Sequence, residues 1–488
     1  MNAAEAIRRT VEMTDFRATL GELRDAGARF ITIFLAELAG RADLADRAEP
    51  AGPALVALLA LHGDLILLKA PVGPDSRIDG LKLGDWWPAA AWPERELLER
   101  NPHLVGERSV TSPRLTSPDP DLLDRTLSGL DVFTIPFGPV RSGVFEAIQF
   151  QIETGGEDVS RLQTRPFFKH RGIQARMRGL TPAQSVAVAE RVAGVASCAY
   201  ASAFSEAVER AAGIEAPPQA QRWRAVLCEL ERMACHLDVI AKEAETTALY
   251  VGQARFQLLK ETVQQLRSRL TGSRFGRGAI LPGGVQTAGQ LDPQGLLAEF
   301  DGLERELERD RRLFLATASM TDRLNGSGHL DRRLIEDYGA VGPLARGSGV
   351  SVDARHERPY GAYRRLGLRV VTEPEGDALA RINVRFGELS ESLRILRQAT
   401  EQIQRQPGAL TVPLPKRGSG TGCGWAEAPQ GELVIWVALR DGLIGQVHIA
   451  SPSLRNWPLF DHAFPNDVLT DFAFIEHSFG LTVAGADR

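Results

Sequence analysis

Apolar residues recur with a helical period through residues 181–318. Thr181 followed by Pro182 is typical of an N-cap and a first helical position, and Gly213 is typical of a helix end. The pattern therefore predicts one long helix over 181–213. The same 3.6-residue period predicts four further helices. They cover 217–250, 253–271, 293–318 and 376–405.

Alternating and short apolar runs predict strands on both sides of this helical region. The segment 131–168 alternates apolar and polar residues around Gly155-Gly156, which predicts a hairpin or meander. The segment 431–453 has the same character and turns at Asp441-Gly442. Small sheets are therefore expected beside the long helices.

The order of these elements predicts an α+β fold with two unequal parts. Residues 1–110 form a small α+β domain with the strands "RFITIFLAEL" and "DLILLKA", while the preceding "ALVALLAL" is interpreted as a helix end. The Ser-, Thr- and Pro-rich segment 111–129 is interpreted as a linker. Residues 130–488 form a large, mainly helical domain: a long helix bundle with flanking hairpins, small sheets and a loop-rich stretch at 324–365.

The charge, the hydrophobicity and the cysteine content of the chain argue against several classes of function. The formal net charge of -5 gives no electrostatic reason to expect a nucleic-acid partner. The most apolar stretch is broken by His62-Gly63-Asp64 and is too short to span a bilayer, so a membrane role must come through partners. Four cysteines without a CxxC pair exclude a disulfide framework and argue against an iron–sulfur cluster held by this chain alone.

Two local patterns could bind a metal but have simpler explanations. Cys228 and Cys235 share a helix face next to His236, yet small buried core residues account for them better, because free cysteine is among the most buried residue types. His170 in "FFKHRG" could be a ligand, and a hydrogen-bonded structural histidine is the alternative.

Eight motifs in collinear order carry a family resemblance. The motifs are "WPAAAWPERELLERNPHLVGE", "HRGIQ", "RVAGVA", "LCELERMACHL", "LTGSRFGRGAILPGGV", "GPLARGSGVSVDARHERPYGAY", "CGWAEAPQGELVIWVALRDG" and the C-terminal "SPSLRNWPLF…GADR". On these motifs the chain resembles the large subunit of NiFe hydrogenases and the quinone-site subunit (the D subunit) of respiratory complex I. Its N-terminal part resembles the C subunit of complex I, and the fused arrangement is similar to formate-hydrogenlyase-type large subunits.

The resemblance also shows what this chain lacks. In the hydrogenases four thiolates hold nickel, and the matching positions here are Ala193, Ala196, Thr482 and Gly485. None of these side chains supplies a thiolate. Cys198 lies two residues past the motif, about 200° round the predicted helix from Ala196, so it is not expected to substitute.

Other functional groups of the family are replaced as well. Gln174 stands at the proton-carrying glutamate of "HRGxE", and an amide does not titrate. Gly194 and Phe145 stand where complex I places the tyrosine and histidine that hydrogen-bond the quinone headgroup. We expect a smaller, more apolar site, filled by Phe167, Phe168 and Phe479, with Thr482 as its main polar side chain.

The polar framework of the family is retained. These polar residues either line a cavity that faces a neighbouring electron-transfer subunit or form structural ion pairs. The ion-pair explanation is favoured. The pocket-facing or cluster-facing candidates are Arg191, His170, Arg171, Gln174, Arg346, Asp353, Arg355 and Asp487.

The resemblance implies a role in a larger assembly. We expect a metal-free large subunit of a membrane-bound, complex-I-like oxidoreductase that couples electron transfer to ion translocation. Its partners would be an iron–sulfur small subunit resembling the B subunit of complex I, antiporter-like membrane subunits and a protein like the H subunit of complex I, at the cytoplasmic face of a bacterial inner membrane. No nickel–iron centre or iron–sulfur cluster is expected on this chain. The alternatives are a structural or assembly subunit, and a quinone-reducing subunit with altered headgroup contacts.

Overall fold

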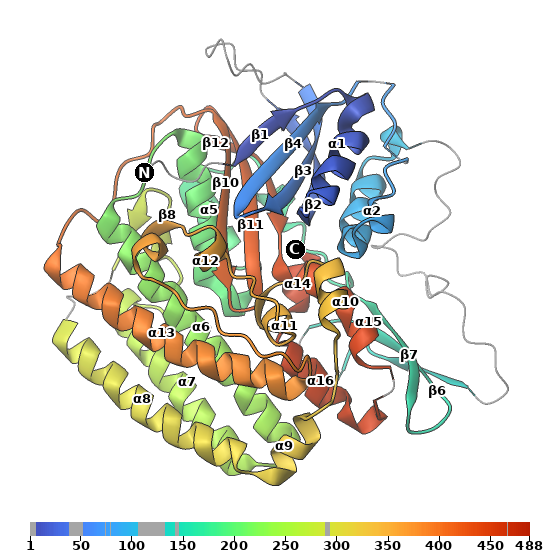
Figure 1. Ribbon diagram of the computed structural model, residues 1–488. Coiled ribbons are helices and arrows are strands. Elements are labelled where there is room, and N and C mark those ends of the chain that lie inside the picture. Colours follow the sequence, from blue (N-terminus) through green and yellow to red (C-terminus); the bar gives the residue numbers. More distant parts are fainter. Residues whose placement is uncertain are drawn as a thin grey trace.

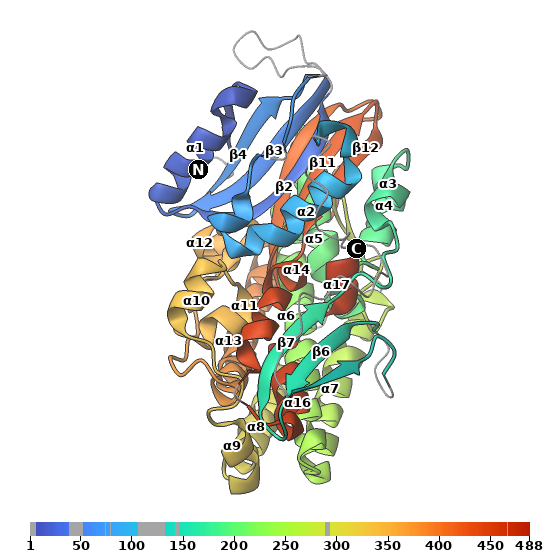
Figure 2. The same cartoon turned by 90° about the vertical axis from the view of Figure 1, so that its right-hand side faces the viewer.

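A computed structural model describes most of the chain. It covers residues 6–38, 52–73, 75–78, 80–105, 132–141, 146–287, 293–465 and 467–488. The predicted linker at 111–129 and Phe145 lie outside these ranges. The domain boundaries predicted from the sequence therefore stay predictions. The α+β fold class is confirmed: long helices lie beside several small sheets (Figures 1 and 2).

The N-terminal sheet is buried on both faces, which explains the most apolar stretch of the sequence. Its strand order is β1-β4-β3-β2, with a parallel β1–β4 pair and antiparallel pairs elsewhere. One face packs on α1, while the other contributes Phe34 and Val56 to the core of the large domain. The elements are β1 Ile7–Thr10, α1 Met13–Asp25, β2 Arg29–Leu38, β3 Gly52–Leu61, β4 Asp64–Pro71 and α2 Ala91–Arg100.

The interpretation of "ALVALLAL" as a helix end is wrong. This stretch is β3, a central strand that joins β4 through a turn at His62 and Gly63, both with positive φ. A strand covered on both faces carries apolar residues at every position, so it lacks the alternation that marks a half-buried strand.

A second antiparallel sheet forms the centre of the molecule. It consists of β10 Gly420–Ala428, β11 Gly431–Arg440 and β12 Leu443–Ala450. The predicted turn at Asp441-Gly442 is confirmed, with φ of 50° and 81° at the two residues. Helix α5 Ser197–Ala212 packs directly on β10, and glycines allow this close approach. A Cβ on Gly424 would lie 2.5 Å from the Ala207 nitrogen.

Four long helices pack together on the other side of α5 (Figure 1). The four helices predicted from the helical period of apolar residues are thus confirmed. Helix α6 carries buried residues along nearly its whole length. Their bounds are α6 Pro218–Thr246, α7 Tyr250–Thr271, α8 Pro293–Leu315 and α13 Ala378–Arg405. The short hairpin of β8 Ile280–Leu281 and β9 Gly284–Val285 follows α7.

The remaining elements are short and surround the C-terminus. The predicted meander is a three-stranded antiparallel sheet in the order β5-β6-β7. The loop-rich stretch at 324–365 contains only short helices. The elements are β5 Phe133–Phe137, β6 Gln149–Thr154, β7 Val159–Arg165, α3 Ile173–Met177, α9 Ala318–Leu324, α10 Arg332–Asp337, α11 Gly342–Arg346, α12 Ala354–Glu357, α14 Pro452–Asn456, α15 Phe460–Ala463, α16 Phe472–Phe479 and α17 Val483–Asp487.

The single helix predicted over 181–213 is interrupted. Its two ends are as predicted: Thr181 forms a capping box with Gln184, and Gly213 ends the helix with φ of 69°. Between them, α4 Pro182–Ala189 stops, the chain becomes extended at Ala193, and α5 restarts at Ser197. The carboxylate of Glu231 on α6 accepts hydrogen bonds from the first backbone N–H groups of α5, at Cys198 and Ala199. A tertiary contact thus replaces the helical bonds that a continuous helix would make.

We predict that Gly424→Ala destabilises the protein by about 1–3 kcal/mol, because the added methyl group has no room between β10 and α5. Gly302→Ala in α8 is the matched control, since a Cβ there meets nothing within 4 Å. Alanine at Gly302 should raise stability by up to about 1 kcal/mol through helix propensity. Urea unfolding of both variants measures the difference, and equal stability of the two would contradict the tight α5–β10 contact.

Candidate functional site

The interruption between α4 and α5 brings the predicted site together. Arg171 is the residue that joins its two halves. Its guanidinium donates to the carbonyls of Arg191 at 2.9 Å and Val192 at 2.6 Å, and also to that of Ala484 at 2.9 Å. The segment carrying Ala193 and Ala196 therefore lies against α17, whose N-terminus carries Thr482 and Gly485. Arg171 acts here as a structural tie between backbone carbonyls.

Two carboxylates, those of Glu146 and Asp487, further anchor the C-terminal helix beside this segment. Glu146 accepts hydrogen bonds from the backbone of Val483 at 2.6 Å and Ala484 at 3.0 Å, at the N-terminus of α17. Asp487 accepts from the backbone nitrogens of Phe167 at 2.7 Å and Lys169 at 3.0 Å. Burial raises the pKa of the Asp487 carboxyl, and these two N–H groups oppose that rise.

His170 and Gln174 also have structural partners. His170 Nδ1 lies 2.6 Å from the carbonyl oxygen of Asp487, which favours the hydrogen-bonded interpretation of this histidine. The side-chain oxygen of Gln174 accepts a bond of 2.9 Å from Ile449 N and ties α3 to β12. Arg488 is buried and pairs with Glu96 of the N-terminal domain.

Hydroxyl groups lie around Thr482 and Gly485, the last two predicted ligand positions. Thr482 caps α17 by accepting from Gly485 N at 3.1 Å, and Ser453 Oγ lies 3.3 Å from its hydroxyl. Tyr200 donates to Ser451 Oγ at 3.2 Å, and burial is the main cause that raises the Tyr200 pKa to about 12. A Cβ on Gly485 would lie 2.6 Å from Thr482 Oγ1. Thr482 is therefore one of four hydroxyl groups here, so the site is more polar than the sequence suggested.

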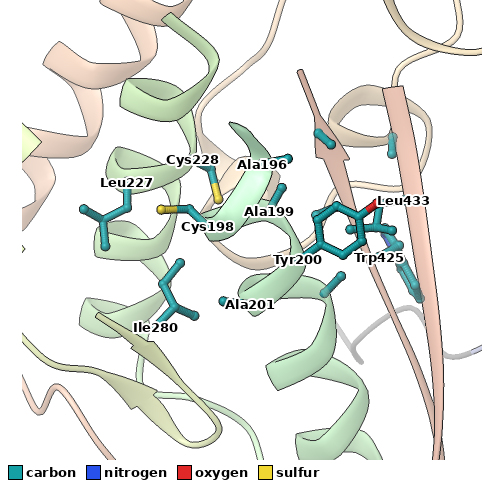
Figure 3. Packing of buried hydrophobic residues seen from close by; sticks show 14 of the residues in the cluster. Ala196, Cys198, Ala199, Tyr200, Ala201, Leu227, Cys228, Ile280, Trp425 and Leu433 are labelled. Carbon is teal, nitrogen blue, oxygen red and sulfur yellow. The ribbon is translucent and has the colours of Figure 1, made fainter. Parts of the chain in front are cut away.

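The first two predicted ligand positions hold closely packed alanines. Ala193 and Ala196 are 2% and 0% exposed and belong to the main hydrophobic core. Cys198 does not take their place. Its sulfur is directed toward Cys228 of α6, while Tyr200 on the same helix points toward the strands (Figure 3). Burial, followed by the charge of Glu231, raises the pKa of the Cys198 thiol well above its usual value, so the thiolate is disfavoured.

These side chains do not fit a nickel–iron centre. Soft thiolates hold such a centre, and the four matching positions offer two methyl groups, one threonine hydroxyl and one glycine. The threonine hydroxyl is already bonded to Gly485 N. Within the described ranges, no group of three or more His, Cys, Asp and Glu side chains is arranged to hold a metal ion.

The other retained residues of the framework belong to a separate, fully buried ion-pair network. Arg346 donates to Glu388 of α13 at 2.7 Å and to Glu427 of β10 at 2.9 Å. Arg355 is paired with Asp353 at 2.7 Å and with Glu229 of α6 at 2.9 Å. The network joins α6, α11, α12, α13 and β10, which supports the structural interpretation of Arg346, Asp353 and Arg355.

Most charged or ionisable members of this network were not predicted from the sequence. Its unpredicted members are Glu229, Arg232, His236, Glu388 and Glu427. A signal was present: Glu229, Arg232 and His236 stand at spacings of three and four on the apolar stripe of a helix, where charged residues are rarely buried unless paired. The hydrogen bond of 2.8 Å between His236 Nε2 and Glu388 explains the histidine beside Cys235 without a metal.

Burial and the neighbouring charges determine which groups of this network are ionised. Burial alone would raise the pKa of Glu229, but Arg355 and Arg232 and the hydroxyls of Ser392 and Tyr363 lower it to about 2. Burial lowers the pKa of His236 to about 4, despite its bond to Glu388. The Glu229 carboxylate is thus charged and the His236 imidazole is neutral near pH 7.

Comparison with known proteins identifies relatives of this chain. Residues 244–418 match the family model described as the 49 Kd subunit of respiratory-chain NADH dehydrogenase. The membrane-bound hydrogenase subunit alpha of Pyrococcus furiosus is 30% identical over 68% of this chain and 79% of its own length. The D subunit of the NADH-quinone oxidoreductase of Deinococcus radiodurans is 30% identical over 59% of this chain and 71% of its own.

This chain belongs to the family of hydrogenase large subunits and NADH-quinone oxidoreductase D subunits. A solved structure agrees: a chain of the membrane-bound sulfane sulfur reductase, an archaeal respiratory membrane complex, matches with a TM-score of 0.69 and 25% identity. The match covers 73% of this chain and 99% of that one. The resemblance noted from the eight motifs is confirmed. Among the helices of the described residues, none is long and apolar enough to cross a membrane.

We predict that Glu229→Gln lowers the stability at pH 7 by about 3–5 kcal/mol, because Arg355 and Arg232 lose a buried counter-charge. The folded-state pKa of Glu229, about 2, lies below the unfolded value of about 4.3. Its contribution is therefore complete above about pH 4.3 and is lost as the pH falls toward 2. Denaturant unfolding from pH 7 to pH 3 should show a smaller acid-dependent loss in the variant.

The control for this prediction is Glu304→Gln, which removes an exposed partner of Arg397. It should change stability by less than about 1 kcal/mol and leave the pH dependence unaltered. A Glu229→Gln protein with wild-type stability and wild-type acid sensitivity would contradict the role of the buried network.

Proposed function

We propose that this chain is a metal-free large subunit of a membrane-bound, complex-I-like oxidoreductase. The observation that carries the proposal is the site between residues 191–196 and 482–487. We propose that Ala193, Ala196, Thr482 and Gly485 stand at the four ligand positions of the family. Arg171 ties together the backbones of the two segments that carry them. The family architecture is retained around a position without thiolates, which supports a role that does not include hydrogen chemistry on this chain.

The surface next to this site has the character of a partner interface. Arg191 is exposed over 54% of its side chain, and Val195 and Phe275 are each 42% exposed. Two loops form this surface, and Glu190 joins them by accepting a 2.6 Å bond from Gly278 N. An arginine beside exposed apolar side chains is a composition favoured at protein interfaces. We propose that an iron–sulfur small subunit binds here.

The relatives support a role in electron transfer without specifying the acceptor. They come from a hydrogenase, an NADH-quinone oxidoreductase and a sulfane sulfur reductase. The same fold therefore occurs in complexes with different terminal chemistry, so loss of nickel does not imply loss of electron transfer. We propose a peripheral position at the cytoplasmic face of a bacterial membrane. Antiporter-like proteins and a protein like the H subunit of complex I are the further partners of this proposal.

A purely structural subunit is the second candidate. It is favoured by the hydroxyl cluster of Tyr200, Ser451, Ser453 and Thr482, whose hydrogen bonds are largely made within the protein. In that case the residues next to the site would affect assembly but not any redox property of a neighbouring cluster. The two candidates therefore differ in a measurable way.

We predict that Arg191→Ala leaves the melting temperature of the isolated chain within a few degrees of wild type, because the side chain is largely exposed. It should reduce the small subunit recovered with a tagged chain, or shift the reduction potential of the nearest cluster in the purified complex, since nearby charge tunes that potential. Affinity purification and redox titration monitored by electron paramagnetic resonance measure both effects.

Arg171→Ala is the matched control, because this arginine ties Val192 to Ala484 inside the chain. It should lower the melting temperature strongly. A normal potential and normal assembly with Arg191→Ala would refute the proposed interface. Weakened assembly with an unchanged cluster potential would favour the structural subunit.

We further predict that the purified chain carries no stoichiometric nickel. Elemental analysis after expression with added nickel checks this, with a known nickel protein prepared in parallel to verify recovery. Nickel at one equivalent per chain would contradict the metal-free proposal, because it would require ligands other than the four expected positions.

A further inference from the structure

A large cavity lies between the N-terminal domain and the loop-rich part of the large domain, well separated in sequence from the site described above. Its volume is about 770 Å³. The N-terminal domain contributes Arg29 and Trp87, and the large domain contributes Tyr338, His356 and Arg358. A cavity of this size can hold a small metabolite.

Three arginines converge on one carboxylate behind this cavity. Glu432 of β11 is fully buried and accepts from Arg29 Nη1 at 2.7 Å and from Arg455 Nη1 at 3.0 Å. Arg358, which is 3% exposed, forms an ion pair with the other oxygen of Glu432. Two of these arginines, Arg29 and Arg358, also line the cavity.

Several guanidinium donors of this cluster have no hydrogen-bond partner. They are Arg29 Nη2, Arg358 Nε, Arg358 Nη1, Arg455 Nε and Arg455 Nη2. Glu357 lies 3.8 Å from Arg29 Nη2 and 3.7 Å from Arg358 Nη1, which is too far for a hydrogen bond. Buried polar groups of native proteins are nearly always paired, so this concentration of unpaired donors requires an explanation.

The cluster also holds surplus positive charge. Three guanidinium groups face two carboxylates, those of Glu432 and Glu357. Burial, and then the neighbouring Arg29, lower the pKa of Arg358 to about 10. The nearby carboxylate of Glu427 is already engaged by Arg346 and by the backbone of Ala354. The acidic residues at the rim, Glu336 and Asp337, are exposed to solvent.

We propose that the arginine-lined floor of this cavity binds an oxyanion, namely the phosphate or carboxylate group of a small ligand. Guanidinium groups bind both oxyanions through paired, charge-assisted hydrogen bonds. Arg29 and Arg358 line the cavity and carry buried donors for which the protein supplies no acceptor. The bound anion balances the surplus charge, and the aromatic wall of Trp87 and Tyr338 is available to the rest of the ligand. This binding site is independent of the proposed electron-transfer role.

The test uses the purified full chain and two probes, pyrophosphate and citrate, at constant ionic strength adjusted with potassium chloride. At least one probe should raise the melting temperature in a saturable manner, and calorimetry should give its dissociation constant. The probe that binds more tightly identifies the ligand as a phosphate or a carboxylate. Arg358→Gln should weaken binding by about tenfold or more, because it removes a charge-assisted contact.

Two controls keep this result interpretable. Arg365→Gln removes an exposed arginine near Arg358 in sequence and should bind the probe like wild type. Without any probe, Arg358→Gln should melt no lower than wild type, because it removes surplus buried charge. If Arg358→Gln fails to fold, Arg29→Gln, at a side chain 14% exposed, provides the same comparison. The absence of saturable binding by both probes, or equal binding by the Arg365 and cavity variants, would overturn the proposal.

Discussion

The rest of the structure depends on the ion pairs that Arg346 makes in the interior of the large domain. Its guanidinium is 0% exposed and contacts Glu388 of the long helix α13 and Glu427 of the central sheet. Glu229 extends the network to α6 through Arg355. A buried charge is tolerated only when its partners are held in place, so the network fixes the relative position of the helix bundle, the short helices and the sheet.

A different set of contacts holds the C-terminal segment in place. Helix α17 is held by Glu146 at its start and by contacts of Asp487 and Arg488 at its end. All three are contacts between side chains and distant backbone or side-chain groups. As a result, the interrupted segment between α4 and α5 and the last residues of the chain form one site, although almost three hundred residues separate them in sequence.

The two halves of this site are packed in different ways. Two alanines from the interrupted segment are part of the hydrophobic core, and the glycine near the C-terminus lies against three hydroxyl groups. A side chain at Gly485 would meet Thr482, Ser451 and Ser453, so this half of the site is filled by the protein itself. Arg171, Arg346 and Arg355, in contrast, hold backbone carbonyls or carboxylates, which gives each of them a structural role. The side chain of Arg191 next to this site is more than half exposed.

Sequence patterns alone predicted the four long helices of the bundle, the capped helix start at Thr181, the helix end at Gly213 and the turn at Asp441. Residue identity alone shows that Ala193, Ala196, Thr482 and Gly485 carry no thiolate. These properties depend on local backbone preferences, on the spacing of apolar residues, or simply on residue identity. Only the tertiary structure decided that β3 is a strand, because burial on both faces removes the alternation that identifies one. Only the tertiary structure also decided that the helix breaks before Ser197, where Glu231 from another helix satisfies the freed N–H groups. The spacing of apolar residues indicates which side chains are buried, but it does not indicate which distant groups they contact. Buried charges are paired through such distant contacts, so their partners cannot be predicted from the spacing.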